Sequence, residues 1–132
     1  MKKEQKYILW FKEITSNYVP WVGGKNASLG EMYSKLSKKG INIPDGFALT
    51  SKAYWYYLEE NGIDKKIKRI FKKFNPQSIK NLQKIGRQTR NLILKAKLPK
   101  NLEREILKNY KKLSKKYGED FTDVAVRSSA TA

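Results

Sequence analysis

Two adjacent glycines and a lysine near the start of the chain lead into a helical pattern, in the sequence Val22-Gly23-Gly24-Lys25-Asn26-Ala27-Ser28-Leu29-Gly30-Glu31-Met32. Glycine has no Cβ, so the pair permits a tight turn with positive φ that other residues resist. Apolar residues then recur at i, i+3, i+4 and i+7, which are Leu29, Met32, Tyr33 and Leu36. The pattern predicts a helix from about Asn26 to Lys38, ended by Gly40 as a left-handed cap.

The start of this helix offers chemistry for an anion. Asn26 can cap the helix, or Ser28 with Glu31 can form a capping box one turn later. Free N–H groups and the positive end of the helix dipole, with the ammonium of Lys25 beside them, favour phosphate. The spacing is not that of a Walker A loop, and on local chemistry alone an ordinary turn is the favoured interpretation.

Composition restricts the classes of function. The length of 132 residues suits one domain with a modest core, and no apolar run is long enough to span a membrane or form a signal peptide, so we expect a cytoplasmic protein. The sequence has no cysteine, which excludes disulfides and thiolate sites. It has no histidine, which excludes an imidazole base, a histidine metal ligand and a phosphohistidine carrier.

The formal net charge of +17 raises the alternative of a non-enzymatic, basic, helical module that binds nucleic acid. The lysines are spread over every predicted helix at polar positions, which favours a solvated surface with only nonspecific charge effects. The aromatic run Tyr54-Trp55-Tyr56-Tyr57 could stack on bases, but its helical spacing favours packing.

The remaining pattern predicts an α+β fold with about five helices on a small sheet of about three strands. The expected strands are Tyr7–Phe11, Phe47–Thr50 and Val124–Arg127. The other helices are expected from Thr50 or Ser51 to Asn61-Gly62, from Ile63 to Phe74, from near Ser78 to before Pro99, and from Leu102 to Gly118.

Arg127 lies at the carboxyl end of the last predicted strand, where open α/β sheets place groups that contact ligands. The alternative is a structural ion pair with Asp120 or Asp123. Because the sequence stops shortly after this strand, we expect it to be part of a larger domain.

Three separated motifs resemble one family. They are Val22–Met32, Ile43–Thr50 with Ala53-Tyr54, and Val126-Arg127-Ser128-Ser129-Ala130-Thr131-Ala132. In this order and spacing they resemble the nucleotide-binding domain of the PEP/pyruvate-binding dikinases. Within this family, the sequence Asn-Ala-Ser-Leu-Gly-Glu-Met is most similar to the corresponding sequence of the phosphoenolpyruvate synthases. The resemblance implies that residues 1–132 form a single domain, the first lobe of an ATP-grasp-like domain, truncated after the last motif.

The resemblance also implies the site. The lysine and arginine that match Lys25 and Arg127 contact the phosphates of ATP in the family, and two cations on separate elements could clamp a polyphosphate. Gly23, Gly24, Ser128, Ser129 and Thr131 are weaker candidates for contacts with the phosphates. No catalytic residue and no metal ligand is expected in this segment.

The implied full-length enzyme converts ATP, pyruvate and water to AMP, phosphoenolpyruvate and phosphate with Mg²⁺, a kinase-type transferase reaction of gluconeogenesis. Its other parts would be a second ATP-grasp lobe with the metal ligands, a phosphohistidine domain and a pyruvate-binding barrel. Phosphoryl transfer needs more groups than this segment holds, so we predict that the segment alone is inactive. A related phosphotransferase of the pyruvate phosphate dikinase or rifampicin phosphotransferase type stays open, because the acceptor is chosen elsewhere.

Overall fold

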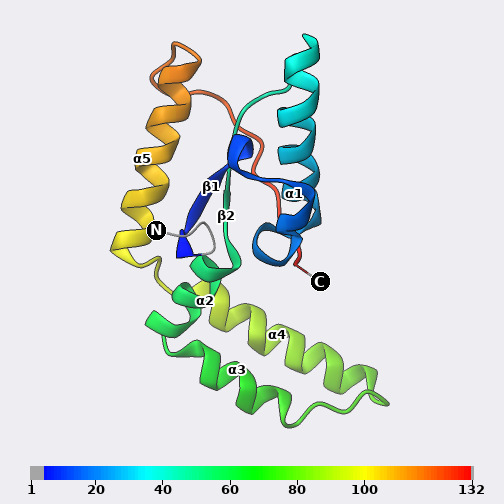
Figure 1. The fold of residues 1–132 in the computed structure, drawn as a ribbon. Coiled ribbons are helices and arrows are strands. Elements are labelled where there is room, and N and C mark those ends of the chain that lie inside the picture. The colour runs from blue at the N-terminus through cyan, green and yellow to red at the C-terminus, as the bar shows by residue number, and fades with distance from the viewer. Residues whose placement is uncertain (1–4, 132) are drawn as a thin grey trace. The chain divides into compact units, whose positions relative to one another are not determined.

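The computed structural model describes residues 5–131, which form two compact units (Figure 1). The first unit contains the chain up to Tyr54 together with the chain from Lys100 onward, and the second contains Trp55–Pro99. In the described part of the chain, no helix combines the length and the apolar character that crossing a membrane requires.

The first unit is built on a two-stranded antiparallel sheet. Strand β1 spans Ile8–Trp10 and strand β2 spans Phe47–Leu49, with Leu9 opposite Ala48. Helix α1 (Val19–Leu36) and helix α5 (Lys100–Lys116) lie on opposite sides of the two strands in Figure 1. Short 3₁₀ helices occupy Phe11–Glu13, Ser16–Tyr18 and Ser37–Lys39.

The second unit is helical. Helix α2 (Ser51–Glu60) leads from the first unit into it, and helices α3 (Ile63–Phe71) and α4 (Ile79–Lys95) follow. The side chain of Asn61 joins the two ends of this unit: its amide donates to the carbonyl of Lys97 at 2.9 Å and its oxygen accepts from the Lys97 N–H at 3.0 Å. Within residues 5–131, the predicted five helices and the mixed α+β class are confirmed.

Helix ends follow the predicted local chemistry. Gly40, Gly62 and Gly118 have φ of 80°, 61° and 71°, as expected of left-handed caps. Ser78 caps α4, because its hydroxyl accepts from the Asn81 N–H at 3.2 Å.

The start of α1 differs from the prediction. The helix begins at Val19 and is interrupted at Gly23, whose φ of 80° and ψ of 164° are not helical. The two predicted caps are wrong, because Asn26 lies inside the helix and donates its side-chain amide to the Val22 carbonyl at 2.9 Å. Glu31 accepts from the Ser16 N–H at 3.0 Å, so its carboxylate ties α1 to an earlier loop.

The predicted third strand, Val124–Arg127, is wrong. Within residues 5–131 the sheet has two strands, and 124–127 has no regular secondary structure. Val126 is 92% exposed and Val124 is 48% exposed, so neither residue contributes to the core. β-branched residues favour a strand only when a neighbouring strand supplies hydrogen bonds and packing, and this segment has none among the described residues.

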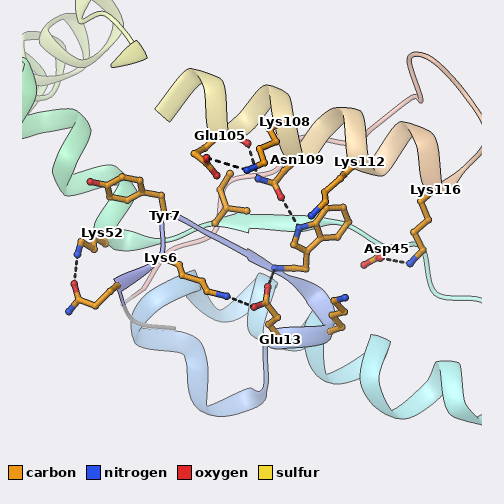
Figure 2. A pocket seen from close by; sticks show the side chains of 14 residues that line it. Lys6, Tyr7, Glu13, Asp45, Lys52, Glu105, Lys108, Asn109, Lys112 and Lys116 are labelled. Atoms are coloured by element: carbon orange, nitrogen blue, oxygen red, sulfur yellow. Dashed lines mark hydrogen bonds and ion pairs between the residues drawn. The ribbon is translucent and has the colours of Figure 1, made fainter. Parts of the chain in front are cut away.

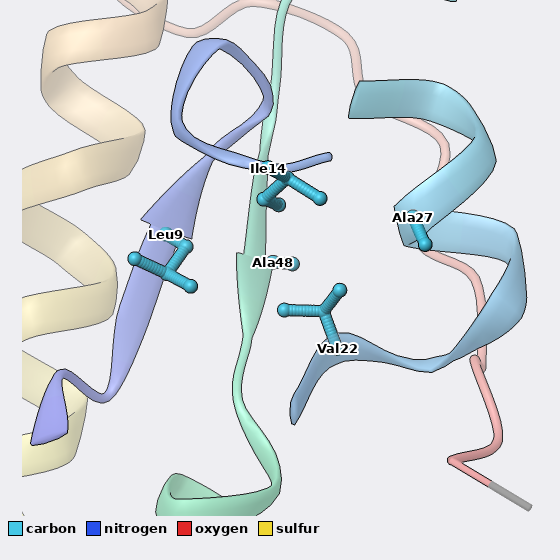
Figure 3. Packing of buried hydrophobic residues seen from close by; sticks show 5 residues of the cluster. All are labelled: Leu9, Ile14, Val22, Ala27 and Ala48. Atoms are coloured by element: carbon cyan, nitrogen blue, oxygen red, sulfur yellow. The ribbon is translucent and has the colours of Figure 1, made fainter. Parts of the chain in front are cut away.

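The core of the first unit joins the sheet to α1. Leu9 and Ala48 from the two strands pack with Ile14, Val22 and Ala27 (Figure 3). This packing fixes the start of α1, and therefore the glycine break, against the sheet.

Candidate functional site

The glycine break at Gly23 is the point where the first and last predicted motifs meet. Gly23 is buried, and a Cβ built on it would lie 2.2 Å from Ser129 Oγ and 2.7 Å from the carbonyl oxygen of Ala130. Since real Cβ atoms do not approach so closely, only glycine fits here, both for its positive φ and for the space. The sequence predicted the positive-φ turn, and the structure adds the close approach.

Backbone groups after the break hold the C-terminal segment. The Gly24 N–H donates to the Ala130 carbonyl at 3.1 Å, and the Asn26 N–H donates to Ser129 Oγ at 3.3 Å. Figure 3 shows this segment, in red, running beside the start of α1. An N-cap side chain typically accepts a hydrogen bond from the second or third N–H of the helix, and Asn26 is the third residue after the break at Gly23. Ser129 therefore caps this part of α1 from 103 residues away.

Lys25 and Arg127 are both exposed. Among the described residues neither forms an ion pair, so the alternative that pairs Arg127 with Asp120 or Asp123 is not observed. Both cations are available to a ligand.

The contact between Ser129 and Asn26 limits how far apart these two cations can be. Arg127 precedes Ser129 by two residues and Lys25 precedes Asn26 by one, so the covalent geometry places the two Cα atoms within about 15 Å. Each extended side chain reaches roughly 6–7 Å from its Cα. One polyanion could therefore contact both side chains.

The other predicted site residues divide into two groups. Gly23, Gly24 and Ser129 make the contacts between the motifs, while Ser128 and Thr131 are exposed. Sequence reasoning missed the backbone partners, which are the Asn26 N–H and the Ala130 carbonyl. The only local signal for them was the glycine pair, which also marks places where a second backbone comes close.

A separate groove of about 1200 Å³ lies between β1 and α5, and none of the predicted nucleotide-binding residues lines it (Figure 2). Of the six lysines that line it, three form ion pairs with carboxylates and Lys52 donates a hydrogen bond to Gln5. Lys6 pairs with Glu13 at 2.8 Å, and Lys116 pairs with Asp45 and donates to the Tyr33 hydroxyl at 3.0 Å.

The hydrogen bond to Asp45, followed by that to Tyr33, raises the pKa of Lys116 well above its ordinary value. At the same seam the indole N–H of Trp10 donates to Asn109 Oδ1 at 2.8 Å. The Trp10–Asn109 hydrogen bond joins β1 to α5, and Lys116 joins α5 to Asp45, which precedes β2, and to Tyr33 of α1. We therefore interpret the groove as part of the packing of the first unit.

A hollow of about 450 Å³ in the second unit is lined by Lys66, Arg69, Ile70, Gln88, Asn91, Leu92 and Lys95 and contains no predicted site residue. Over residues 5–131 there is also no group of three or more acidic side chains that could hold a metal ion. The glycine break and the segment docked on it are therefore the candidate site.

The residues that build this site lie within the match to one known family. The model described as "Pyruvate phosphate dikinase, AMP/ATP-binding domain" matches residues 19–132. The chain belongs to this family. Both the glycine break and the Ser129 segment thus fall inside the AMP/ATP-binding domain.

The relatives of this chain include proteins named phosphoenolpyruvate synthase. The protein of Synechocystis sp. is 44% identical over 134 residues, which cover 98% of this chain and 16% of that protein. The protein of Aquifex aeolicus is 45% identical and that of Helicobacter pylori 46% identical, over 98% and 96% of this chain and 15% and 16% of those proteins. The chain spans about 16% of the length of the curated relatives that it matches.

Proposed function

We propose that this chain is the ATP-phosphate-binding part of a phosphoenolpyruvate synthase, which converts ATP, pyruvate and water to AMP, phosphoenolpyruvate and phosphate. The AMP/ATP-binding family and the names of the relatives support the proposal. The observation that supports it best is the docking of Ser129 and Ala130 on the glycine break, because it limits the separation of the Lys25 and Arg127 Cα atoms to about 15 Å, and among the described residues neither side chain forms an ion pair.

In this proposal the two cations divide the work of binding. The ammonium of Lys25 acts as a mobile point charge, and the guanidinium of Arg127 offers a planar fork that matches two phosphate oxygens. Together they hold the phosphate chain in one orientation and stabilise charge on it. Mg²⁺, when bound, would neutralise further phosphate charge, and we propose that its protein ligands belong to the second lobe of the domain.

The rest of the mechanism is proposed for other segments of the full-length enzyme. This chain would form the first lobe of an ATP-grasp-like domain, and a second lobe would supply the adenine and metal contacts. The chain has no histidine, so a phosphohistidine carrier would lie in another domain, and a barrel would bind pyruvate. We therefore expect no turnover from the 132-residue chain alone.

The test uses the full-length enzyme that carries this sequence. Lys25→Ala and Arg127→Ala each remove a charge that faces the phosphates, and we expect kcat/KM for ATP to fall by about 10²–10³. Lys39→Ala and Arg87→Ala are matched controls, because both side chains are exposed and lie outside the three motifs. Wild-type kinetics in the Lys25 and Arg127 variants would refute their assigned roles.

The acceptor is a separate question that the same enzyme can answer. The names of the relatives favour pyruvate with water as the second acceptor. Formation of AMP would be measured with pyruvate alone, with pyruvate plus inorganic phosphate, and with rifampicin. Turnover that required added phosphate or rifampicin would replace the synthase with the dikinase or the antibiotic phosphotransferase.

A further inference from the structure

We propose that Gly23 and Ser129 are positioning residues, which dock the two motifs on each other and so assemble the cations into one phosphate site. The ligand half of this inference rests on the function proposed above. The docking half rests only on contacts within the chain, and it can be tested without nucleotide.

The first observation is that Gly23 is unlike the other glycines with positive φ. Gly40, Gly62 and Gly118 also have positive φ, but a Cβ at each would meet nothing within 4 Å. A Cβ at Gly23 would meet the hydroxyl of Ser129 and the backbone of Ser129 and Ala130, at 2.2–2.7 Å. A flexible side chain could move aside, but a backbone carbonyl cannot move without undocking the segment.

The second observation concerns the cap of the helix after the break. A residue at the position of Gly23 ordinarily supplies the capping side chain, and glycine has none. Ser129 Oγ fills the space where that side chain would begin and accepts from the Asn26 N–H. The absence of a side chain at Gly23 therefore leaves the space that the Ser129 hydroxyl occupies, and this hydroxyl supplies the cap that Gly23 cannot.

The third observation concerns the C-terminal segment between its contacts at Thr122 and Ser129, in which residues 123–128 are all exposed. Thr122 is anchored on α5, since its carbonyl accepts from the Tyr110 hydroxyl at 2.8 Å and its N–H donates to Ser114 Oγ at 3.2 Å. Arg127 is five residues further along, so without docking it could move over a radius of about 18 Å around this anchor. Docking of Ser129 restricts that range and keeps Arg127 near Lys25.

Docking and phosphate binding are therefore coupled. If only a fraction of the molecules has the segment docked, the apparent dissociation constant for ATP rises by the inverse of that fraction. By reciprocity, ATP bound to both cations stabilises the docked segment. Loss of docking thus raises the KM for ATP, while turnover at saturating ATP is largely kept.

The first experiment measures amide hydrogen exchange of the 132-residue chain without nucleotide. In Gly23→Ala we expect the Gly24 and Asn26 amides to exchange at least tenfold faster, while amides of the sheet stay protected. Gly40→Ala is the control for positive φ alone, because it places Ala at a φ of 80° (with ψ of 6° instead of 164°) where a Cβ meets nothing within 4 Å. Unchanged exchange of the Gly24 and Asn26 amides in Gly23→Ala would overturn the docking inference.

The second experiment separates positioning from general stability and uses a milder change. Ser129→Ala removes the hydroxyl that caps the helix, and we expect roughly fivefold faster exchange at Asn26. In the full-length enzyme it should raise the KM for ATP several-fold with kcat nearly unchanged, and Ser129→Thr, which keeps a hydroxyl, should restore much of the affinity. Faster exchange at Asn26 with an unchanged KM would overturn the positioning role and leave the proposed ATP site intact. Absence of ATP binding by the wild-type enzyme would instead refute the proposed function.

Discussion

Two glycines lie inside helices, Gly30 in α1 of the first unit and Gly86 in α4 of the second. Alanine at each position would show whether helix propensity or the packing around the glycine determines the change in stability. Replacing glycine by alanine inside a helix stabilises it by about 0.5–1 kcal/mol when space allows. At Gly86 the nearest atom to a new Cβ is Arg90 Nη1 at 3.1 Å, the end of a flexible side chain. At Gly30 the new Cβ would lie 2.6 Å from Ile14 Cβ and 2.7 Å from the Ile14 carbonyl oxygen.

The expected signs are therefore opposite. Inserting a methyl group into a packed core costs about 1–3 kcal/mol, and we expect the upper end at Gly30 because the clash includes backbone. After the propensity gain, Gly30→Ala should destabilise the first unit by about 2 kcal/mol. Gly86→Ala should stabilise the second unit by about 0.5–1 kcal/mol.

Amide hydrogen exchange is the suitable assay, since it reports the opening free energy of each unit separately and does not require one cooperative transition. The slowest amides near Leu9 report the first unit, and the slowest amides of α4 report the second. A Gly30→Ala variant as stable as the wild type would refute the close packing of α1 on Ile14. A destabilised Gly86→Ala variant would refute the propensity argument.

The remaining predictions concern the core, acid stability and charge. Leu9 is fully buried, so Leu9→Ala should lower the free energy of unfolding by about 2–5 kcal/mol, whereas Leu94→Ala, at an 80% exposed position, should change it by less than about 0.5 kcal/mol; equal effects in exchange measurements would contradict the core. Hydrogen bonds from the Lys35 ammonium and then from the Ser16 N–H lower the pKa of Glu31, so its contribution to stability is present above the ordinary glutamate pKa and is lost as the pH falls through the lowered one. The stability difference between wild type and Glu31→Gln, measured by urea unfolding across this range, should therefore shrink on acidification, and a pH-independent difference would contradict the assignment. The net charge of +17 should give duplex DNA binding at about 50 mM salt that is largely lost by about 200 mM in fluorescence titrations, and binding that resists salt would revive the nucleic-acid function.

The parts of the fold that local chemistry determines could be predicted from the sequence. Gly40, Gly62 and Gly118 end helices and Ser78 begins one, because each acts on groups within a few residues. The strand predicted at Val124–Arg127 failed because a strand also needs a neighbour, and neither residue type nor spacing states whether one is present.

In the candidate site, too, the local features could be predicted and the contacts between distant residues could not. The sequence and the family resemblance selected Gly23, Lys25, Ser129 and Arg127, but not the manner in which two of them meet. Gly23 was expected to form a turn, and the cap of its helix was assigned to Asn26 or to Ser28 with Glu31. The actual cap comes from Ser129, at a separation over which local propensity carries no information.

The distance along the chain between Asn26 and Ser129 has a consequence for synthesis on the ribosome. The second unit is one continuous stretch, so it has been translated in full before the chain reaches Lys100. At about 5–20 residues per second, the 103 residues between the two partners take roughly 5–20 s to appear. Throughout that interval the helix that carries Lys25 exists without its cap, so a nascent chain cannot dock the two motifs until Ser129 has been synthesised.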